Sequence, residues 1–148
     1  MYLQFIFSFL ATLGFSILFN IPQKSIIKAS FVGGCGWIAF VYWRESFGSL
    51  IAASFVGASV VAIISEIFAR KFKETVTVFV IPGIIPLVPG AGMYYAMLAA
   101  MEKDFSKFAI VGSETLFMAG GIAAAILLVS SIAKMFFEFK KSRKNRDQ

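Results

Sequence analysis

The residues with the clearest chemical potential lie in a stretch rich in proline and glycine. The stretch covers residues 82–92 and reads PGIIPLVPGAG, between two apolar runs. Each proline in a helix interior removes an amide donor and clashes with the preceding turn, at about 3 kcal/mol. The glycines allow the backbone to leave helical angles. A helix that enters this stretch must therefore break within it.

A break of this kind is chemically useful if the surrounding run crosses a membrane. Lipid cannot satisfy free backbone groups, so broken backbone is tolerated there only when protein buries it or when it lines a wet cavity. A helix restarting near Ala91 presents free amides and a positive dipole end to a carboxylate. The carbonyls freed before it could accept an ammonium or coordinate a cation. The predicted solute-facing residues are Pro82, Gly83, Pro86, Pro89, Gly90, Ala91, Gly92 and Tyr94. The alternative is a re-entrant loop or hairpin bend that only turns the chain.

Tyr94 is included because it follows the break by about one helical turn, beside Tyr95. Its hydroxyl could contact a bound solute. Anchoring at the membrane interface explains the two tyrosines equally well.

Glu114 is a second candidate, because it lies seven residues beyond Lys107 within the last apolar run. A charged carboxylate inside a membrane costs about 2.5–3.5 kcal/mol at the centre of a span and commonly marks an ion path. Glu114 is only about 10 Å from the start of its helix at 1.5 Å per residue. An ion-coupling role and an interfacial pair with Lys103 or Lys107 both remain open.

Glu66 lies four residues before Arg70. This spacing makes two side chains neighbours on a helix, and exposed pairs of this kind contribute about 0–1 kcal/mol to stability. We assign Glu66 and Arg70 to a surface pair at the end of a helix.

The composition indicates an all-α integral membrane protein. Hydrophobic residues make up 59% of the chain and charged residues 15%, whereas soluble domains average about 45–50% and about 25%. A bundle this small buries little surface, so many apolar side chains must face lipid or a partner protein.

The chain has one cysteine and no histidine. These counts exclude an internal disulfide, a Cys/His zinc site and any catalytic triad built on histidine. We therefore expect no metal, no cofactor and no enzymatic activity.

Charged residues divide the chain into about five predicted spans. They cover roughly residues 2–21, 27–43, 48–69, 75–101 with its break, and 107–137, since a span needs about 20 mostly apolar residues. The spans form a transmembrane domain over residues 1–139. Residues 140–148 form a basic cytoplasmic tail.

The distribution of lysine and arginine predicts the orientation. In the five-span arrangement, ten basic residues lie on the side of the tail, and three (Arg44, Lys103 and Lys107) lie on the other. Basic residues favour the cytoplasmic side, so the N-terminus is predicted outside and the C-terminus inside the cell membrane. Membrane orientation explains the net charge of +6 better than binding to nucleic acid, which we do not expect.

Two segments resemble the small membrane subunit of the threonine/serine exporter family. They are PGIIPLVPGAGMYYAM at residues 82–97 and GFSILFNIP at residues 14–22. The first is fairly specific in a membrane setting, and the resemblance covers nearly the whole chain. Glu114 lies outside both segments, so its predicted role rests on physical argument alone.

The resemblance implies half of a secondary exporter. The sequence agrees with this, because many transporters pair two related halves and no internal repeat is evident in this chain. A larger five-span membrane subunit is the implied partner. The implied solutes are small and carboxylate-bearing, either threonine and serine or a dicarboxylate such as succinate, and the implied driving force is a proton gradient. The alternative is a membrane scaffold or accessory subunit of another complex. A scaffold would not require the proline break.

Overall fold

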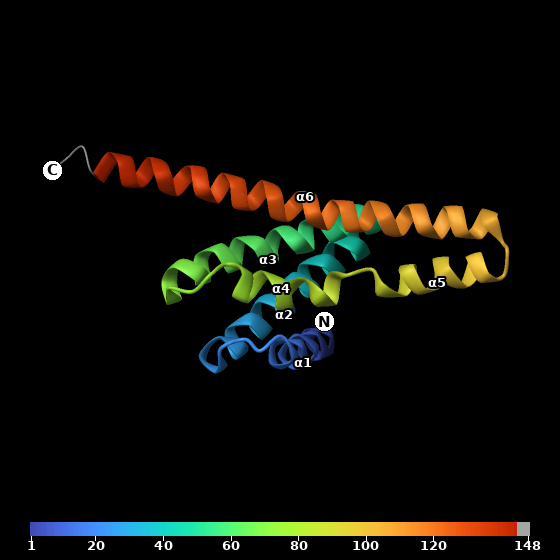
Figure 1. Cartoon of the computed structure of the whole chain (residues 1–148), viewed down its shortest axis with the longest axis horizontal. Coiled ribbons are helices and arrows are strands. Elements are labelled where there is room, and N and C mark those ends of the chain that lie inside the picture. The colour runs from blue at the N-terminus through green and yellow to red at the C-terminus, as the bar shows by residue number, and fades with distance from the viewer. Residues whose placement is uncertain (145–148) are drawn as a thin grey trace.

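The computed structural model describes residues 1–144 as a chain of helices, with side chains described up to residue 136, and contains no strand within that range. The elements are α1 (Tyr2–Leu18), α2 (Gln23–Phe47), α3 (Leu50–Phe72), α4 (Thr77–Ile84), the short 3-10 helix η1 (Ile85–Leu87), α5 (Gly90–Met101) and α6 (Phe105–Lys144). Figure 1 shows α1 to α4 gathered at one end of the molecule and α6 running along its whole length.

Helices α2 and α3 run antiparallel and cross closely at two glycines. A Cβ atom placed on Gly57 would lie 3.0 Å from the carbonyl oxygen of Gly36 and 3.0 Å from the Cβ atom of Phe40. At one end of the pair, Lys24 forms an ion pair with Glu74 at 3.0 Å. The absence of side chains at the crossing lets the two backbones touch, as is common between helices in membranes.

Helix α1 packs against α2 through small and hydroxyl-bearing side chains. Thr12 occupies the space that a side chain at Gly33 would need, and the Ser8 hydroxyl donates to the Gly33 carbonyl at 3.2 Å. The Thr12 and Ser16 hydroxyls donate to carbonyls one turn earlier in α1, at 2.8 Å and 2.7 Å. The buried face of α1 is therefore polar but hydrogen-bonded.

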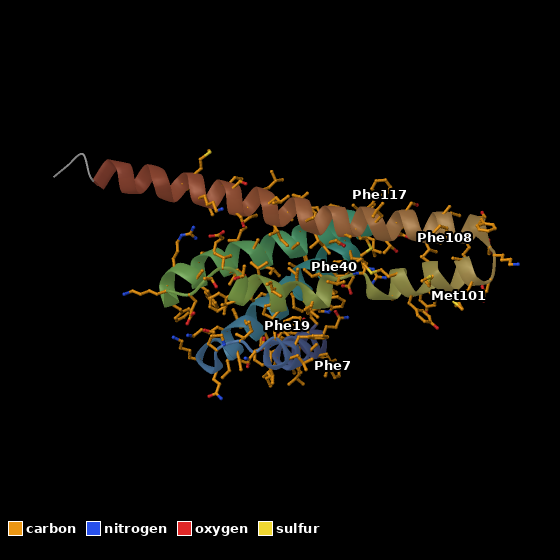
Figure 2. All side chains as sticks on the ribbon, viewed as in Figure 1. Phe7, Phe19, Phe40, Met101, Phe108 and Phe117 are labelled. Carbon is orange, nitrogen blue, oxygen red and sulfur yellow. The ribbon has the colours of Figure 1, made fainter. Side chains whose placement is uncertain are left out.

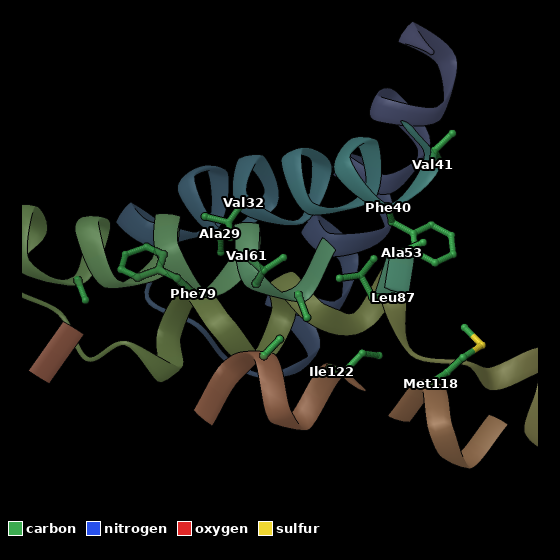
Figure 3. Packing of buried hydrophobic residues seen from close by; sticks show 13 residues of the cluster. Ala29, Val32, Phe40, Val41, Ala53, Val61, Phe79, Leu87, Met118 and Ile122 are labelled. Carbon is green, nitrogen blue, oxygen red and sulfur yellow. The ribbon is translucent and has the colours of Figure 1, made fainter. Parts of the chain in front are cut away.

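The apolar core lies where α2, α3, α4 and η1 meet (Figure 3). Val32, Val61 and Phe79 are fully buried there. The rings of Phe79 and Phe68 meet edge to face with centroids 5.9 Å apart. Helix α6 closes the core on one side with Met118 and Ile122.

Helix α6 has 40 residues, a length of about 60 Å. Its middle meets the first turn of α3, since a Cβ atom on Gly121 would lie 3.5 Å from the carbonyl oxygen of Ile51. Residues 129–136 of α6 then lie beside residues 63–70 of α3, so these two helices are parallel. The segment of α6 before Gly121 extends beyond the start of α3 and pairs with α5 as a hairpin that projects from the bundle (Figure 1).

Much of the outer surface is apolar. Figure 2 shows Phe7, Met101 and Phe117 on the outside of the helices, and they are 67%, 76% and 63% exposed. Lipid or a partner protein must cover such side chains in a stable assembly.

The predicted all-α membrane class is confirmed, and the count of about five spans is approximate. Three helices (α2, α3 and α6) are long and apolar enough to cross a membrane, and the number is four if the bent pair formed by α4 with η1 and α5 crosses as one span. Helix α1 is apolar but has only 17 residues.

Two predicted boundaries differ from the structure. Helix α2 covers Gln23–Phe47 rather than residues 27–43, because the polar residues that flank the apolar run are helical as well. Helix α6 continues to Lys144, so the first residues of the predicted tail are helical. The remainder of that tail, residues 145–148, lies outside the described residues.

Candidate functional site

The predicted break is present and is spread over three short elements. Helix α4 contains Pro82 and ends at Ile84. The 3-10 helix η1 follows with Pro86 in its first turn, and Val88 and Pro89 connect it to α5. The helical segments before and after the break are bent by 52°. The prediction that the fourth span is broken is therefore confirmed.

The first half of the break is anchored in the core. Pro82 and Gly83 are buried, and a Cβ atom on Gly83 would lie 3.0 Å from Val61 Cγ1 and 3.2 Å from Val32 Cγ1. Leu87 is also buried and reaches the crossing of α2 and α3, since its Cδ2 atom lies 3.1 Å from the Cβ position of Gly57. These contacts fix the end of α4 against α2 and α3.

The second half of the break is open. Gly90 and Ala91 are exposed, and no atom lies within 4 Å of a Cβ placed on Gly90. The Gly90 amide donates to the Val88 carbonyl at 2.8 Å, and the Met93 amide donates to the Pro89 carbonyl at 3.1 Å. Within residues 1–144 no acceptor is found for the amides of Ala91 and Gly92. Two free donors therefore remain at the start of α5, and Gly90 does not supply one of them.

Gly92 has a packing role that the sequence did not reveal. A Cβ atom at this position would overlap the hydroxyl of Thr115 on α6 and would lie 3.3 Å from Thr115 Cβ. Thr115 is buried, and its hydroxyl donates to the Val111 carbonyl at 2.7 Å. The missing side chain at Gly92 thus lets α5 approach α6.

Tyr94 lies near the exposed start of α5. It is 65% exposed, and its ring meets that of Tyr95 edge to face with centroids 5.4 Å apart. The outward direction is compatible with either contact to a solute or anchoring at an interface.

Glu114 is exposed on α6. Among the described residues its carboxylate forms no ion pair with Lys103 or Lys107 and accepts no hydrogen bond. The interfacial pair that we considered is therefore not formed in this structure. The ion-coupling role of Glu114 stays a prediction.

The assignment of Glu66 to a surface pair is wrong. Glu66 is only 6% exposed, because α6 covers this face of α3. The pair itself is formed, since Arg70 Nη1 lies 2.6 Å from Glu66 Oε2. The same nitrogen also donates to the Glu66 backbone carbonyl at 2.7 Å. Sequence reasoning missed that the carboxylate of this pair is buried, whereas Arg70, two residues before the end of α3, is exposed.

A cavity of about 300 Å³ adjoins this ion pair between α3 and α6. Apart from Glu66 and Arg70, its walls are apolar and are formed by Ile63, Ile67, Val129, Ile132, Ala133 and Phe136. A second cavity, of about 410 Å³, is bordered by Phe5, Cys35 and Tyr42, among others. Neither of these two cavities includes a residue of the break.

The predicted site residues are thus divided between two places. Pro82, Gly83 and Pro86 lie against the bundle, whereas the start of α5, Tyr94 and Glu114 lie on the projecting hairpin. The side chains described up to residue 136 contain no group of three or more residues suited to hold a metal ion.

Apolar helices of spanning length indicate a membrane protein, and an apolar helix pair broken by a Pro/Gly stretch with free amides is typical of transporters. The chain matches the family described as Threonine/Serine exporter, ThrE over residues 4–132. It therefore belongs to the threonine/serine exporter family.

A protein of Haemophilus influenzae, strain Rd, described as "Uncharacterized protein", is 21% identical to this chain over 97 residues. The matched segment is 66% of this chain and 33% of that relative, so this chain spans about a third of the relative's length. No solved structure matches the chain.

Proposed function

We propose that this chain is half of a secondary transporter that exports small carboxylate-bearing metabolites. Membership of the threonine/serine exporter family supports this proposal. The observation that carries it furthest is the broken span with two unpaired amides at the exposed start of α5. Such helix starts bind carboxylates in transporters with broken helices.

In this proposal the solute path passes the break at Pro82, Gly83, Pro86, Pro89, Gly90, Ala91 and Gly92. The amides of Ala91 and Gly92 donate to the solute carboxylate, and Tyr94 borders the path. Gly90 keeps the approach free of side-chain atoms, which agrees with the open space around it. Threonine, serine and succinate all present the required carboxylate, and export is coupled to protons.

The second half of the transporter is a larger five-span membrane subunit. This part of the proposal is supported by the exposed apolar surface and by the projecting hairpin, which has bundle contacts along only part of α6. It also agrees with a relative about three times as long as the matched segment.

The N-terminus lies outside the cell membrane and the C-terminus in the cytoplasm. The parallel arrangement of α3 and α6 supports the alternation of five spans, since such an alternation gives the third and fifth spans the same direction. Basic residues also gather at one end of the bundle, where Lys24 pairs with Glu74 and Lys28 lies over the ring of Phe72.

Export measurements test the function. Cells that express this chain together with the larger subunit are loaded with radiolabelled threonine, serine or succinate, and efflux is followed after dilution. Efflux should require both chains. Proteoliposomes that export a solute with this chain alone would contradict the two-subunit proposal. No efflux of any of the three solutes from cells with both chains correctly inserted would contradict the exporter function and favour a scaffold.

A further inference from the structure

The cavity between α3 and α6 is lined almost entirely by apolar side chains and is open along its border. It measures about 300 Å³ and lies between residues 63–70 of α3 and residues 129–136 of α6. Large side chains at its border are 48–70% exposed, namely Ile63, Ile67, Ile132 and Phe136. Since both helices are long and apolar enough to cross a membrane, this surface faces either hydrocarbon or another membrane helix.

The cavity has the form of a narrow groove, which we call the α3–α6 groove. The two helices run parallel here, and the lining positions recur every three or four residues on each of them. Seven residues of helix correspond to about 10 Å. An extended hydrocarbon chain lying along the two helices matches this shape.

A second helix fits the α3–α6 groove poorly. Helix interfaces in membranes are enriched in small residues, which let two backbones approach each other. Among the described residues that line the groove, Ala133 alone is small. Helix α6 offers a smoother surface at the exposed residues Gly120, Ala123 and Ala124, where a Cβ atom on Gly120 meets no atom within 4 Å. A flexible acyl chain fills the space between large side chains better than a helix does.

Basic residues gather where the α3–α6 groove ends. On α3, Lys71 and Lys73 come directly after the lining residues and are exposed. On α6, residues 137–144 contain four basic residues and one acidic residue, and the helix continues through them. The spacing of positions 129, 133 and 136 continues at positions 140 and 143, which are a lysine and an arginine. Position 140 is four residues, or about 6 Å, beyond position 136.

The negative charge of Glu66 does not cancel this basic end. Its carboxylate is 6% exposed and lies 2.6 Å from Arg70 Nη1, so the two charges at the border of the groove compensate each other. The α3–α6 groove therefore combines an apolar channel with a positively charged end.

We propose that the α3–α6 groove holds one acyl chain of an anionic phospholipid, whose phosphate lies among the basic residues at the end of the groove. Basic clusters between membrane helices bind such head groups. In the proposed topology this end lies in the cytoplasmic leaflet, which carries the negative surface potential. The inference goes beyond the proposed function, since it concerns the lipid that the chain binds and holds whichever solute is exported.

The experiment places one tryptophan at the groove and measures its quenching by brominated lipids. The full chain carries Phe136→Trp in a background of Trp37→Phe and Trp43→Phe, so that every exchange keeps an aromatic ring. It is reconstituted in phosphatidylcholine vesicles that contain brominated phosphatidylglycerol or brominated phosphatidylcholine with the same acyl chains. The binding constant from quenching should be at least about threefold higher for phosphatidylglycerol. High salt should reduce this preference, because it screens exposed charges.

A probe elsewhere on the same helix provides the control. Phe117 is 63% exposed on α6 and does not border the groove. With Phe117→Trp in the same background, the two brominated lipids should quench equally.

Two sets of variants separate the head group from the acyl chain. Lys140→Gln together with Arg143→Gln should remove most of the preference at position 136, whereas the same loss of charge in Lys103→Gln with Lys107→Gln should leave it unchanged. Ala133→Leu adds bulk inside the groove and should lower quenching at position 136 by both lipids. Its matched control is Ala123→Leu, at an exposed position of α6 outside the groove.

Three results would overturn the proposal. The first is equal quenching at position 136 by the two lipids in wild-type charge background, which requires no variant beyond the probe. The second is a preference that survives both high salt and the loss of the two basic residues. The third is loss of quenching by both lipids at position 136 when the larger subunit is present, because the groove is then covered by protein instead of lipid.

Discussion

The contact between Gly92 and Thr115 allows a packing role and a solute-binding role to be separated by substitution. Gly92→Ala adds one methyl group that overlaps the Thr115 hydroxyl. The overlap cannot be relieved without cost, because Thr115 is buried and its hydroxyl is bonded to the Val111 carbonyl at 2.7 Å. Either α5 moves away from α6 or the Thr115 side chain rotates.

The expected loss in the free energy of unfolding follows from these two routes. Overpacking typically costs 1–3 kcal/mol, and loss of the hydroxyl hydrogen bond costs about 1 kcal/mol. Replacing glycine by alanine in a helix returns roughly 0.5–1 kcal/mol. We expect Gly92→Ala to destabilise the protein by about 1–2 kcal/mol.

Two further variants provide the control. Gly90→Ala introduces the same methyl group two residues earlier, where no atom lies within 4 Å, so it should change stability by less than about 0.5 kcal/mol. Thr115→Ala removes the overlapping hydroxyl. In the Thr115→Ala background, Gly92→Ala should cost much less unfolding free energy than it costs in the wild type. A double-mutant cycle measures this difference as the coupling energy between the two positions.

The assay is unfolding of the purified full chain in mixed micelles, followed by circular dichroism during titration with a denaturing detergent. Equal midpoints for Gly90→Ala and Gly92→Ala would refute the reasoning. A double variant whose loss equals the sum of the two single losses would refute it as well, because the methyl group and the hydroxyl would then be independent.

Three other predictions follow from the described contacts. Gly90→Val places a branched side chain beside the free amides of α5 and should lower solute export at least tenfold with normal assembly, as measured by efflux from reconstituted complexes; export at the wild-type rate would make the break a structural bend. Gly57→Ala places a methyl group 3.0 Å from backbone of α2 and should cost about 1–3 kcal/mol; an unchanged unfolding midpoint would contradict the close crossing. Single cysteines at Lys103 and Gln148, in a Cys35→Ser background, should react with an impermeant reagent from opposite sides; labelling of both from one side would contradict the topology.

The break was predictable from sequence because proline acts locally. The missing amide and the ring of Pro82, Pro86 and Pro89 limit the backbone wherever the chain folds. The bend of 52° between the flanking helices accordingly falls in the predicted stretch. The all-α membrane class was predictable for a similar reason, since hydropathy and the length of apolar runs are properties of the chain alone.

The burial of Glu66 was not predictable in this way. The spacing to Arg70 identifies the pair but says nothing about its neighbours. Burial depends on α6, whose residues 129–136 lie more than 60 positions further along the chain. A usable signal was present, because Glu66 interrupts an apolar run six residues before the end of α3. The packing role of Gly92 was not predictable for a similar reason, because its close neighbour Thr115 lies on another helix.

Helix α6 is one continuous helix, so its contact with α5 and its border with the cavity are joined by a single rod. Its contact with the first turn of α3, at Gly121 and Ile51, lies between its two other engagements. Thr115, which contacts α5, lies six residues before Gly121, or about 9 Å along the helix. Ile132, which borders the cavity, lies eleven residues after Gly121, or about 16 Å along the helix. A stiff rod pivoting at Gly121 moves these two points in opposite directions, the cavity end nearly twice as far. A rigid tilt of α6 that opened the cavity beside Glu66 would therefore move the start of α5 by a smaller distance in the opposite direction.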